Sequence, residues 1–193
     1  DEQWMPRPAL SYGAHKVMVE TQVNDLARRG EVDGRALRLP GIVARPREPN
    51  GLRSAFMSDL MHALAAGENY CCPVSPQATA WWMSARCCVD NLLHAAELQD
   101  PGPQRVWQLP VLHLAMDQVV EALAEAFGDD RRALVSYQPH ADLEALFGRY
   151  PPMRTPQSRA LGFHHDGSAQ TLVRNALSLS QRPRHARASL KAL

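Results

Sequence analysis

The first part of the chain carries apolar residues at the spacing of one helical face. Residues at steps of four and three form a stripe that predicts a helix over 11–29, ended by Gly30. One charged residue stands within this otherwise apolar stripe, so the pattern places an ammonium group at an inward-facing position. The stripe consists of Tyr12, Lys16, Val19, Val23 and Leu26.

After this helix, short segments that are apolar, or that alternate between apolar and polar residues, are interspersed with further segments of helical periodicity. A loop rich in proline and arginine is predicted over 41–51, and Ser84 is placed to cap a helix. Strands interleaved with helices predict an α/β fold. The predicted strands cover 35–40, 69–74, 80–84, 104–109 and 133–137; the predicted helices cover 53–66, 85–98, 116–127 (ended by Gly128), 141–149, a short segment up to Leu161, and 169–179.

Composition sets the broad class of the protein. The 193 residues, 45% of them hydrophobic and 21% charged, suffice for one sizeable core or two small ones. A net charge of +1 gives no field toward nucleic acid or membrane, so neither partner is expected. No apolar run is long enough to span a bilayer, and the acidic start Asp1-Glu2 differs from a secretory leader. We expect a cytoplasmic protein.

Four cysteines occur as two adjacent pairs, Cys71-Cys72 and Cys87-Cys88. Adjacent residues of a strand point to opposite faces, and this spacing differs from that of zinc knuckles. Buried reduced thiols are therefore favoured over a metal site. His164-His165-Asp166 lies in a glycine-flanked loop and is predicted to face solvent rather than to bind metal.

Tyr12 and Lys16 suit acid/base chemistry. Only two lysines stand among 21 basic residues, and one of them follows Tyr12 by a single helical turn. A phenol ordinarily ionises near pH 10, and a neighbouring ammonium favours the phenolate. The alternative is that Tyr12 packs in the core while the stem of Lys16 covers apolar surface and its charge reaches water.

Four segments together resemble the extended short-chain dehydrogenase/reductases, a family that includes nucleotide-sugar epimerases. The segments are SYGAHKVMVE, RRGEVDGRALRLPGIVARP, WWMSARCCVDNLLHAAEL and RALGF, and the resemblance spans most of residues 6–179. It implies the carboxyl-terminal part of a Rossmann-type enzyme that uses NAD (or NADP) to oxidise a secondary hydroxyl of a sugar acid or nucleotide-linked sugar. It also implies that Tyr12 is the catalytic acid/base, and that Lys16 binds the nicotinamide ribose and favours the ionised tyrosine.

The resemblance implies further contacts. The backbone that lies against the nicotinamide ring would be that of Pro40, Gly41, Ile42 and Val43. Gly41 stands where members of the family often have threonine or asparagine. Substrate contacts would come from Asn50, Ser54, Trp81 and Arg86. The fork of Arg86 suits a carboxylate, and its alternative is a salt bridge to Asp90 one turn on. Trp81 and Trp82 are interpreted as one ring over a cleft and one in the core, or as an aromatic platform.

The same resemblance divides the chain. Residues 1–50 would hold the catalytic helix and following strand of an incomplete nucleotide-binding domain. Residues 51–180 would be mainly a substrate domain, with 81–110 returning to the nucleotide domain, and 181–193 a basic tail. A homodimer through the helix over 11–29 is expected, with Ala14, Met18 and Asp25 on its outer face.

Glycine spacing limits what the chain can bind. No two of its eleven glycines are closer than four residues apart, so no G-x-G-x-x-G turn exists to cradle a pyrophosphate. We therefore expect the carboxyl-terminal portion of a longer enzyme, inactive alone. The alternative is a non-catalytic substrate-binding or assembly fragment.

Overall fold

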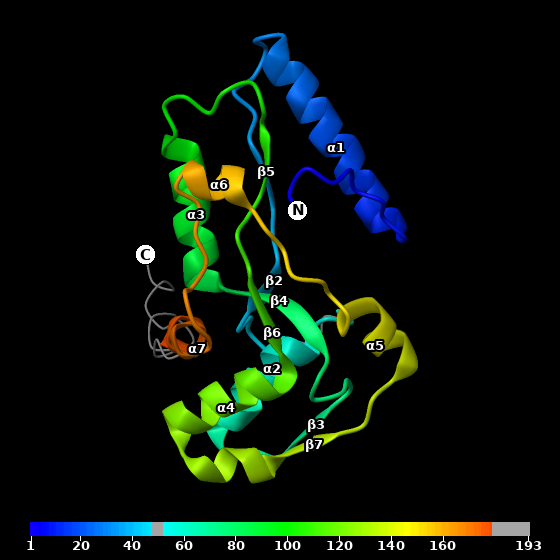
Figure 1. The fold of residues 1–193 in the computed structure, drawn as a ribbon, viewed down its shortest axis with the longest axis vertical. Coiled ribbons are helices and arrows are strands. Elements are labelled where there is room, and N and C mark those ends of the chain that lie inside the picture. The colour runs from blue at the N-terminus through cyan, green and yellow to red at the C-terminus, as the bar shows by residue number, and fades with distance from the viewer. Residues whose placement is uncertain (48–51, 179–193) are drawn as a thin grey trace, which may run out of the picture.

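A computed structural model of the protein describes residues 1–47 and 52–178, in which helices alternate with strands (Figure 1). The predicted α/β class is confirmed. The helices are α1 (Ser11–Arg28), α2 (Phe56–Ala66), α3 (Ala85–Glu97), α4 (Met116–Phe127), the 3-10 helix η1 (Asp129–Leu134), α5 (Ala141–Phe147), α6 (Pro156–Ala160) and α7 (Ala169–Ser178). The strands are β1 (Ala36–Arg38), β2 (Gly41–Val43), β3 (Tyr70–Cys72), β4 (Thr79–Ser84), β5 (Val106–Gln108), β6 (Leu112–Ala115) and β7 (Val135–Tyr137).

The strands form three small sheets. β1 pairs in parallel with β5, and β3 pairs in parallel with β7. The third sheet has the order β2-β4-β6, in which β2 is parallel and β6 antiparallel to β4. Figure 1 shows α1 and α3 on opposite sides of the β1–β5 pair, with α2 and α4 at the other end of the molecule.

Two apolar clusters support these sheets. The larger one packs α2, α4 and α7 around β4, and Leu60, Trp82 and Leu123 are among its fully buried members. The smaller one joins α3 to β5 through Cys87, Trp107 and their neighbours. A chain of this composition was expected to bury one sizeable core or two small ones, and it buries a large and a small one.

Local signals fix several element ends. Ser84 caps α3 as predicted, because its hydroxyl oxygen accepts a hydrogen bond from the Cys87 backbone N–H at 3.0 Å. α4 ends at Gly128, also as predicted, with φ at 121°. Gly67 ends α2 in the left-handed region at φ 74°.

Two sequence-based predictions were wrong in part. The segment 41–51 was predicted to be a loop, but Gly41–Val43 forms β2, because β4 supplies a parallel partner that the local pattern does not reveal. The stretch 129–134 before β7 forms η1, so the strand predicted from residue 133 begins at Val135. β6 was not predicted at all, since it continues almost directly into α4.

The predicted inward stripe of the first helix was also wrong in part. α1 forms with the predicted bounds to within one residue, yet it has no fully buried residue: Tyr12, Lys16 and Val19 are exposed, while Val23 and Leu26 are half-buried. The physical reason is that α1 contacts the β1–β5 pair through polar side chains, Glu20 to Arg38 and Asn24 to the Arg105 backbone, and not through its apolar stripe. No described element covers the Tyr12 side of α1.

Three cysteines are buried and Cys71 is exposed, and all four are free thiols. Burial raises the pKa of Cys72 to about 11 and that of Cys87 to about 12. The prediction of buried reduced thiols therefore holds for three of the four. No helix among the described residues is long and apolar enough to cross a bilayer.

Candidate active site

The first turns of α1 carry the candidate catalytic pair. Tyr12 and Lys16 lie one turn apart, and the Lys16 Nζ atom is 5.4 Å from the centre of the Tyr12 ring. The Tyr12 side chain is open to solvent, with 72% of the residue exposed. Gly13 lets the amino-terminal segment pass close by, because a Cβ there would lie only 2.7 Å from the Cβ of Pro8. The sequence prediction of a neighbouring ammonium and phenol agrees with this geometry.

Polar contacts fix α1 on the sheet. The Arg38 guanidinium of β1 donates two hydrogen bonds to the Glu20 carboxylate, at 2.9 and 2.7 Å, and both side chains are largely covered. The side-chain amide oxygen of Asn24 (Oδ1) accepts a third hydrogen bond from the Arg105 backbone N–H at 3.1 Å. Because Glu20 follows Lys16 by one turn, the bidentate contact sets the rotation of α1 that directs Lys16.

A cleft of about 570 Å³ opens beside this helix. It lies between the amino-terminal segment, α1, the start of β4 and the segment 150–153, and its lining includes Lys16, Arg38 and Trp81. The size falls within the range of small-molecule sites. Lys16 brings a positive charge to its wall that no described acidic group neutralises by an ion pair.

Trp81 and Tyr150 form the aromatic side of the cleft. The Trp81 indole N–H donates to the Pro151 carbonyl oxygen at 2.7 Å, and its ring centre lies 4.9 Å from that of Tyr150. Burial raises the pKa of the Tyr150 phenol, which therefore stays protonated near neutrality. Trp82 is buried in the core, so the interpretation of one ring over a cleft and one in the core is confirmed.

Gly41 allows a close approach between β2 and β4. A Cβ at this position would lie 2.9 Å from both the Trp81 carbonyl oxygen and the Met57 methyl group. A threonine or asparagine here would collide with backbone, which explains the glycine. Pro40 precedes this strand, while Ile42 packs on the smaller cluster and Val43 is buried in the larger one. None of the four residues lines the cleft.

The remaining predicted substrate residues are spread over other surfaces. Arg86 is exposed in the first turn of α3, and within residues 1–47 and 52–178 it forms no ion pair, so the alternative bridge to Asp90 is not made. The Arg45 guanidinium donates a hydrogen bond to the Ser54 hydroxyl oxygen at 3.4 Å. Asn50 and the predicted tail over 181–193 lie outside the described residues. Of the predicted site, the structure thus brings Lys16 and Trp81 into one cleft.

Sequence reasoning missed two residues that shape this region and a buried carboxylate elsewhere in the fold. Arg38 and Glu20 could have been noticed as a charged residue in a short apolar strand and an acidic residue one turn after Lys16. Asp166 was assigned to a solvent-facing loop, and His164 is indeed exposed, but Asp166 is only 7% exposed. Its carboxylate accepts hydrogen bonds from the Ser84 backbone N–H, the Ser84 hydroxyl and the Asn175 amide, at 2.8, 2.6 and 2.8 Å.

Comparison with known proteins gives relatives over most of the chain. It is 35% identical over 170 residues to the D-erythronate dehydrogenase of Cupriavidus necator, covering 86% of this chain and 52% of that protein. It is 32% identical to the D-erythronate dehydrogenase of Haemophilus influenzae, with 86% and 54% covered. The resemblance to the extended short-chain dehydrogenase/reductases is confirmed. The chain spans about half the length of the curated relatives it matches.

Solved structures agree on this Rossmann-type fold. The nucleoside-diphosphate-sugar epimerase from Agrobacterium tumefaciens matches 89% of this chain with a TM-score of 0.82 and 29% identity, over 51% of its own length. The L-threonine dehydrogenase from Cupriavidus necator matches 93% of the chain with a TM-score of 0.79 and 18% identity, over 58% of its length. No protein-family profile matches the chain.

Proposed function

We propose that this chain belongs to an NAD(P)-dependent oxidoreductase that acts on a secondary hydroxyl of a sugar acid or nucleotide-linked sugar. The observation that carries the proposal is the placement of Lys16, which stands next to the Tyr12 ring and also lines a cleft of about 570 Å³. The names of the relatives support the substrate class, since two are D-erythronate dehydrogenases and one solved structure is a nucleoside-diphosphate-sugar epimerase.

Tyr12 and Lys16 have separate tasks in this proposal. The Tyr12 phenolate accepts the proton of the substrate hydroxyl, and the phenol returns a proton when the reaction runs in reverse. The Lys16 ammonium favours the phenolate and donates hydrogen bonds to a ribose hydroxyl. Because Tyr12 is open to water, this attraction is screened until a bound molecule excludes solvent from the two side chains.

The residues present fit one end of a nicotinamide cofactor. Lys16 offers an ammonium at the cleft wall that forms no ion pair among residues 1–47 and 52–178. Pro40, Gly41, Ile42 and Val43 do not line this cleft, so the fit depends on Lys16. When bound, the nicotinamide would supply the hydride acceptor. The spacing of the glycines provides no pyrophosphate cradle, so in this proposal the chain does not turn over substrate by itself.

Self-association through α1 is part of the proposal. Apolar residues on the uncovered side of this helix include Met18 and Val19, which are more than half exposed. Joining two copies at this face would remove that surface from water. Sedimentation that shows only monomers at high concentration would contradict the dimer.

The free thiols suit the cytoplasm, where cysteines stay reduced.

Substitution of Tyr12 tests the chemistry. The assay uses the protein as isolated from its native source, because this chain is not expected to turn over substrate by itself. Tyr12→Phe is expected to lower kcat by a factor of about 100 to 10,000 with little change in the KM for NAD(P), because only proton transfer is lost. Lys16→Ala is expected to lower kcat and also to raise the KM for NAD(P). Tyr137→Phe, a half-buried tyrosine of β7, is the matched control and should retain turnover.

Undiminished turnover in Tyr12→Phe would refute the assignment. It would favour the second candidate, a non-catalytic substrate-binding or assembly component. The specific observation behind that candidate is that the cleft contains Lys16 and Trp81 but is not lined by Tyr12.

A further inference from the structure

Arg7 brings a second positive charge to the wall of the cleft beside α1. It lines the same cleft of about 570 Å³ as Lys16, and it is exposed there. Among residues 1–47 and 52–178, no carboxylate forms an ion pair with Arg7. A guanidinium that is open to a cleft of this size, and that has no acidic partner, is suited to bind an anion.

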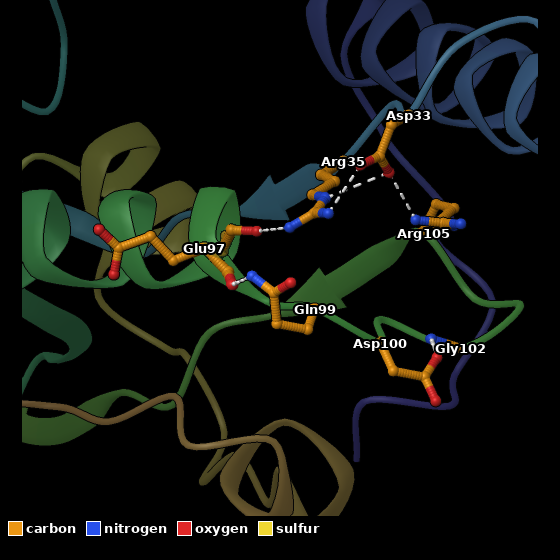
Figure 2. A network of polar contacts seen from close by, with 8 residues as sticks. Asp33, Arg35, Glu97, Gln99, Asp100, Gly102 and Arg105 are labelled. Carbon is orange, nitrogen blue, oxygen red and sulfur yellow. Dashed lines mark hydrogen bonds and ion pairs between the residues drawn. The ribbon is translucent and has the colours of Figure 1, made fainter.

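The arginines at the two ends of β1 are already engaged. Figure 2 shows the guanidinium of Arg35, which directly precedes β1, bonded to the Asp33 carboxylate. Arg38, the last residue of β1, lines the cleft but donates two hydrogen bonds to Glu20. Within the described part of the chain, Arg7 is therefore the arginine of the cleft wall that keeps its guanidinium available to a ligand.

The acidic side chains that line the cleft do not neutralise Arg7 by ion pairs. All three accept hydrogen bonds from other groups: Asp1 from the Gln3 N–H, Glu2 from Ser158 of α6, and Glu20 from Arg38. A bound anion is thus needed to supply the counter-charge of Arg7.

The amino-terminal segment holds Arg7 in place from both sides. The Glu2 carboxylate accepts hydrogen bonds from the Ser158 N–H and hydroxyl, at 3.1 and 2.8 Å. Pro8 lies so close to α1 that a Cβ at Gly13 would be 2.7 Å from the Pro8 Cβ. Arg7 itself has a proline on each side, which restricts its backbone. Because the segment is fixed before a ligand arrives, less ordering is needed on binding.

We propose that Arg7 is a substrate-binding residue that holds the carboxylate of a sugar acid. This inference rests on the proposed function and decides between its two substrate classes. In that function the Lys16 ammonium serves the cofactor ribose, which leaves one guanidinium for the substrate. A guanidinium fork matches one planar carboxylate through two parallel hydrogen bonds, whereas the diphosphate of a nucleotide-linked sugar carries two charged groups. Arg7 takes the role that the sequence suggested for Arg86, which does not line the cleft.

Calorimetric titration with D-erythronate tests the assignment without turnover. The protein as isolated from its native source is first saturated with NADH or NADPH, which cannot accept a hydride. Arg7→Ala is expected to raise the Kd for D-erythronate at least about tenfold, because a charge-assisted pair is lost. Arg7→Lys, which keeps the charge without the fork, should recover part of this loss. An unchanged Kd in Arg7→Ala would overturn the proposal, and so would a parent protein that does not bind D-erythronate.

Matched controls separate recognition of the carboxylate from a change in the shape of the cleft. Arg174→Ala, at an exposed arginine of α7 that does not line the cleft, should keep the Kd of the parent. Erythritol has a hydroxymethyl group in place of the carboxylate, so its binding should be the same in the parent and in Arg7→Ala. An equal loss of affinity for erythritol and D-erythronate would mean that Arg7 only shapes the cleft, which contradicts the proposal.

UDP-glucose is the probe for the other substrate class. If Arg7→Ala weakens the binding of UDP-glucose and leaves that of D-erythronate unchanged, Arg7 binds a diphosphate and the proposal is wrong. Since Arg7 is exposed, Arg7→Ala should remain folded, with a free energy of unfolding within about 0.5 kcal/mol of the parent.

This inference and the proposed chemistry can fail separately. If Tyr12→Phe retains turnover, the assignment of Tyr12 is removed, while a raised Kd in Arg7→Ala would still support the carboxylate contact. If Tyr12→Phe loses turnover and Arg7→Ala keeps the Kd of the parent, only the assignment of Arg7 is lost.

Discussion

Replacement of Asp166 by alanine is expected to destabilise the protein strongly, because this buried carboxylate joins three elements. It accepts hydrogen bonds from the Ser84 backbone N–H and hydroxyl and from the Asn175 amide. Ser84 in turn caps α3, and Asn175 belongs to α7. Removal of the carboxylate leaves these donors without their acceptor in a region closed to water.

The magnitude follows from the number of bonds. Hydrogen bonds to a charged group contribute about 1.5 kcal/mol each at the low end, so three of them amount to about 4.5 kcal/mol. For a chain of this size, that lowers Tm by about 9 to 18 °C. Asp166→Asn should lose about half as much, because the amide oxygen still accepts while its NH₂ group faces a donor.

Thermal unfolding followed by circular dichroism measures the effect. Asp142→Ala is the matched control, since this carboxylate is 89% exposed and its contact with Arg53 is 4.0 Å long. It should stay within about 0.5 kcal/mol of the parent. If Asp166→Ala melts together with Asp142→Ala, the three-way junction does not hold the fold as argued.

Three further predictions concern α1 and the thiols. Glu20→Gln should speed hydrogen exchange across α1 by about tenfold, because the contact with Arg38 holds a helix that has no buried residue. Exchange in α4 should stay the same. Unchanged exchange in α1 would contradict this prediction. Iodoacetamide should label Cys71 alone in the folded protein at pH 8. Because burial raises the pKa of Cys72 to about 11 from 9.0, the stability that its neutral thiol contributes is complete below pH 9 and is lost as the pH rises toward 11, which alkaline melts would show.

Sequence patterns were sufficient where the signal is local. The bounds of α1 and α4 and the cap at Ser84 depend on neighbouring residues, and each was predicted correctly. β2 was missed because three residues make a strand only when β4 lies beside them. The junction at Asp166 was missed because its partner Ser84 is 82 positions away in the chain.

The candidate site divides in the same way. The spacing of Tyr12 and Lys16 on one helix turn is visible in the sequence, and the structure keeps it. The surroundings of Lys16 depend on distant residues such as Arg38, Trp81 and Tyr150, which only the fold brings to one cleft. Whether the Tyr12 side of α1 is covered cannot be read from periodicity, which is why the inward stripe was wrong in part.

The turnover of Lys16 variants tests the central claim most directly, namely that the ammonium of Lys16 assists proton transfer by Tyr12. In the protein isolated from its native source, Lys16→Met should lower kcat by a factor of about 100, while Lys16→Arg, which keeps the charge, should retain more of it. A kcat of Lys16→Met equal to that of the parent would contradict the account.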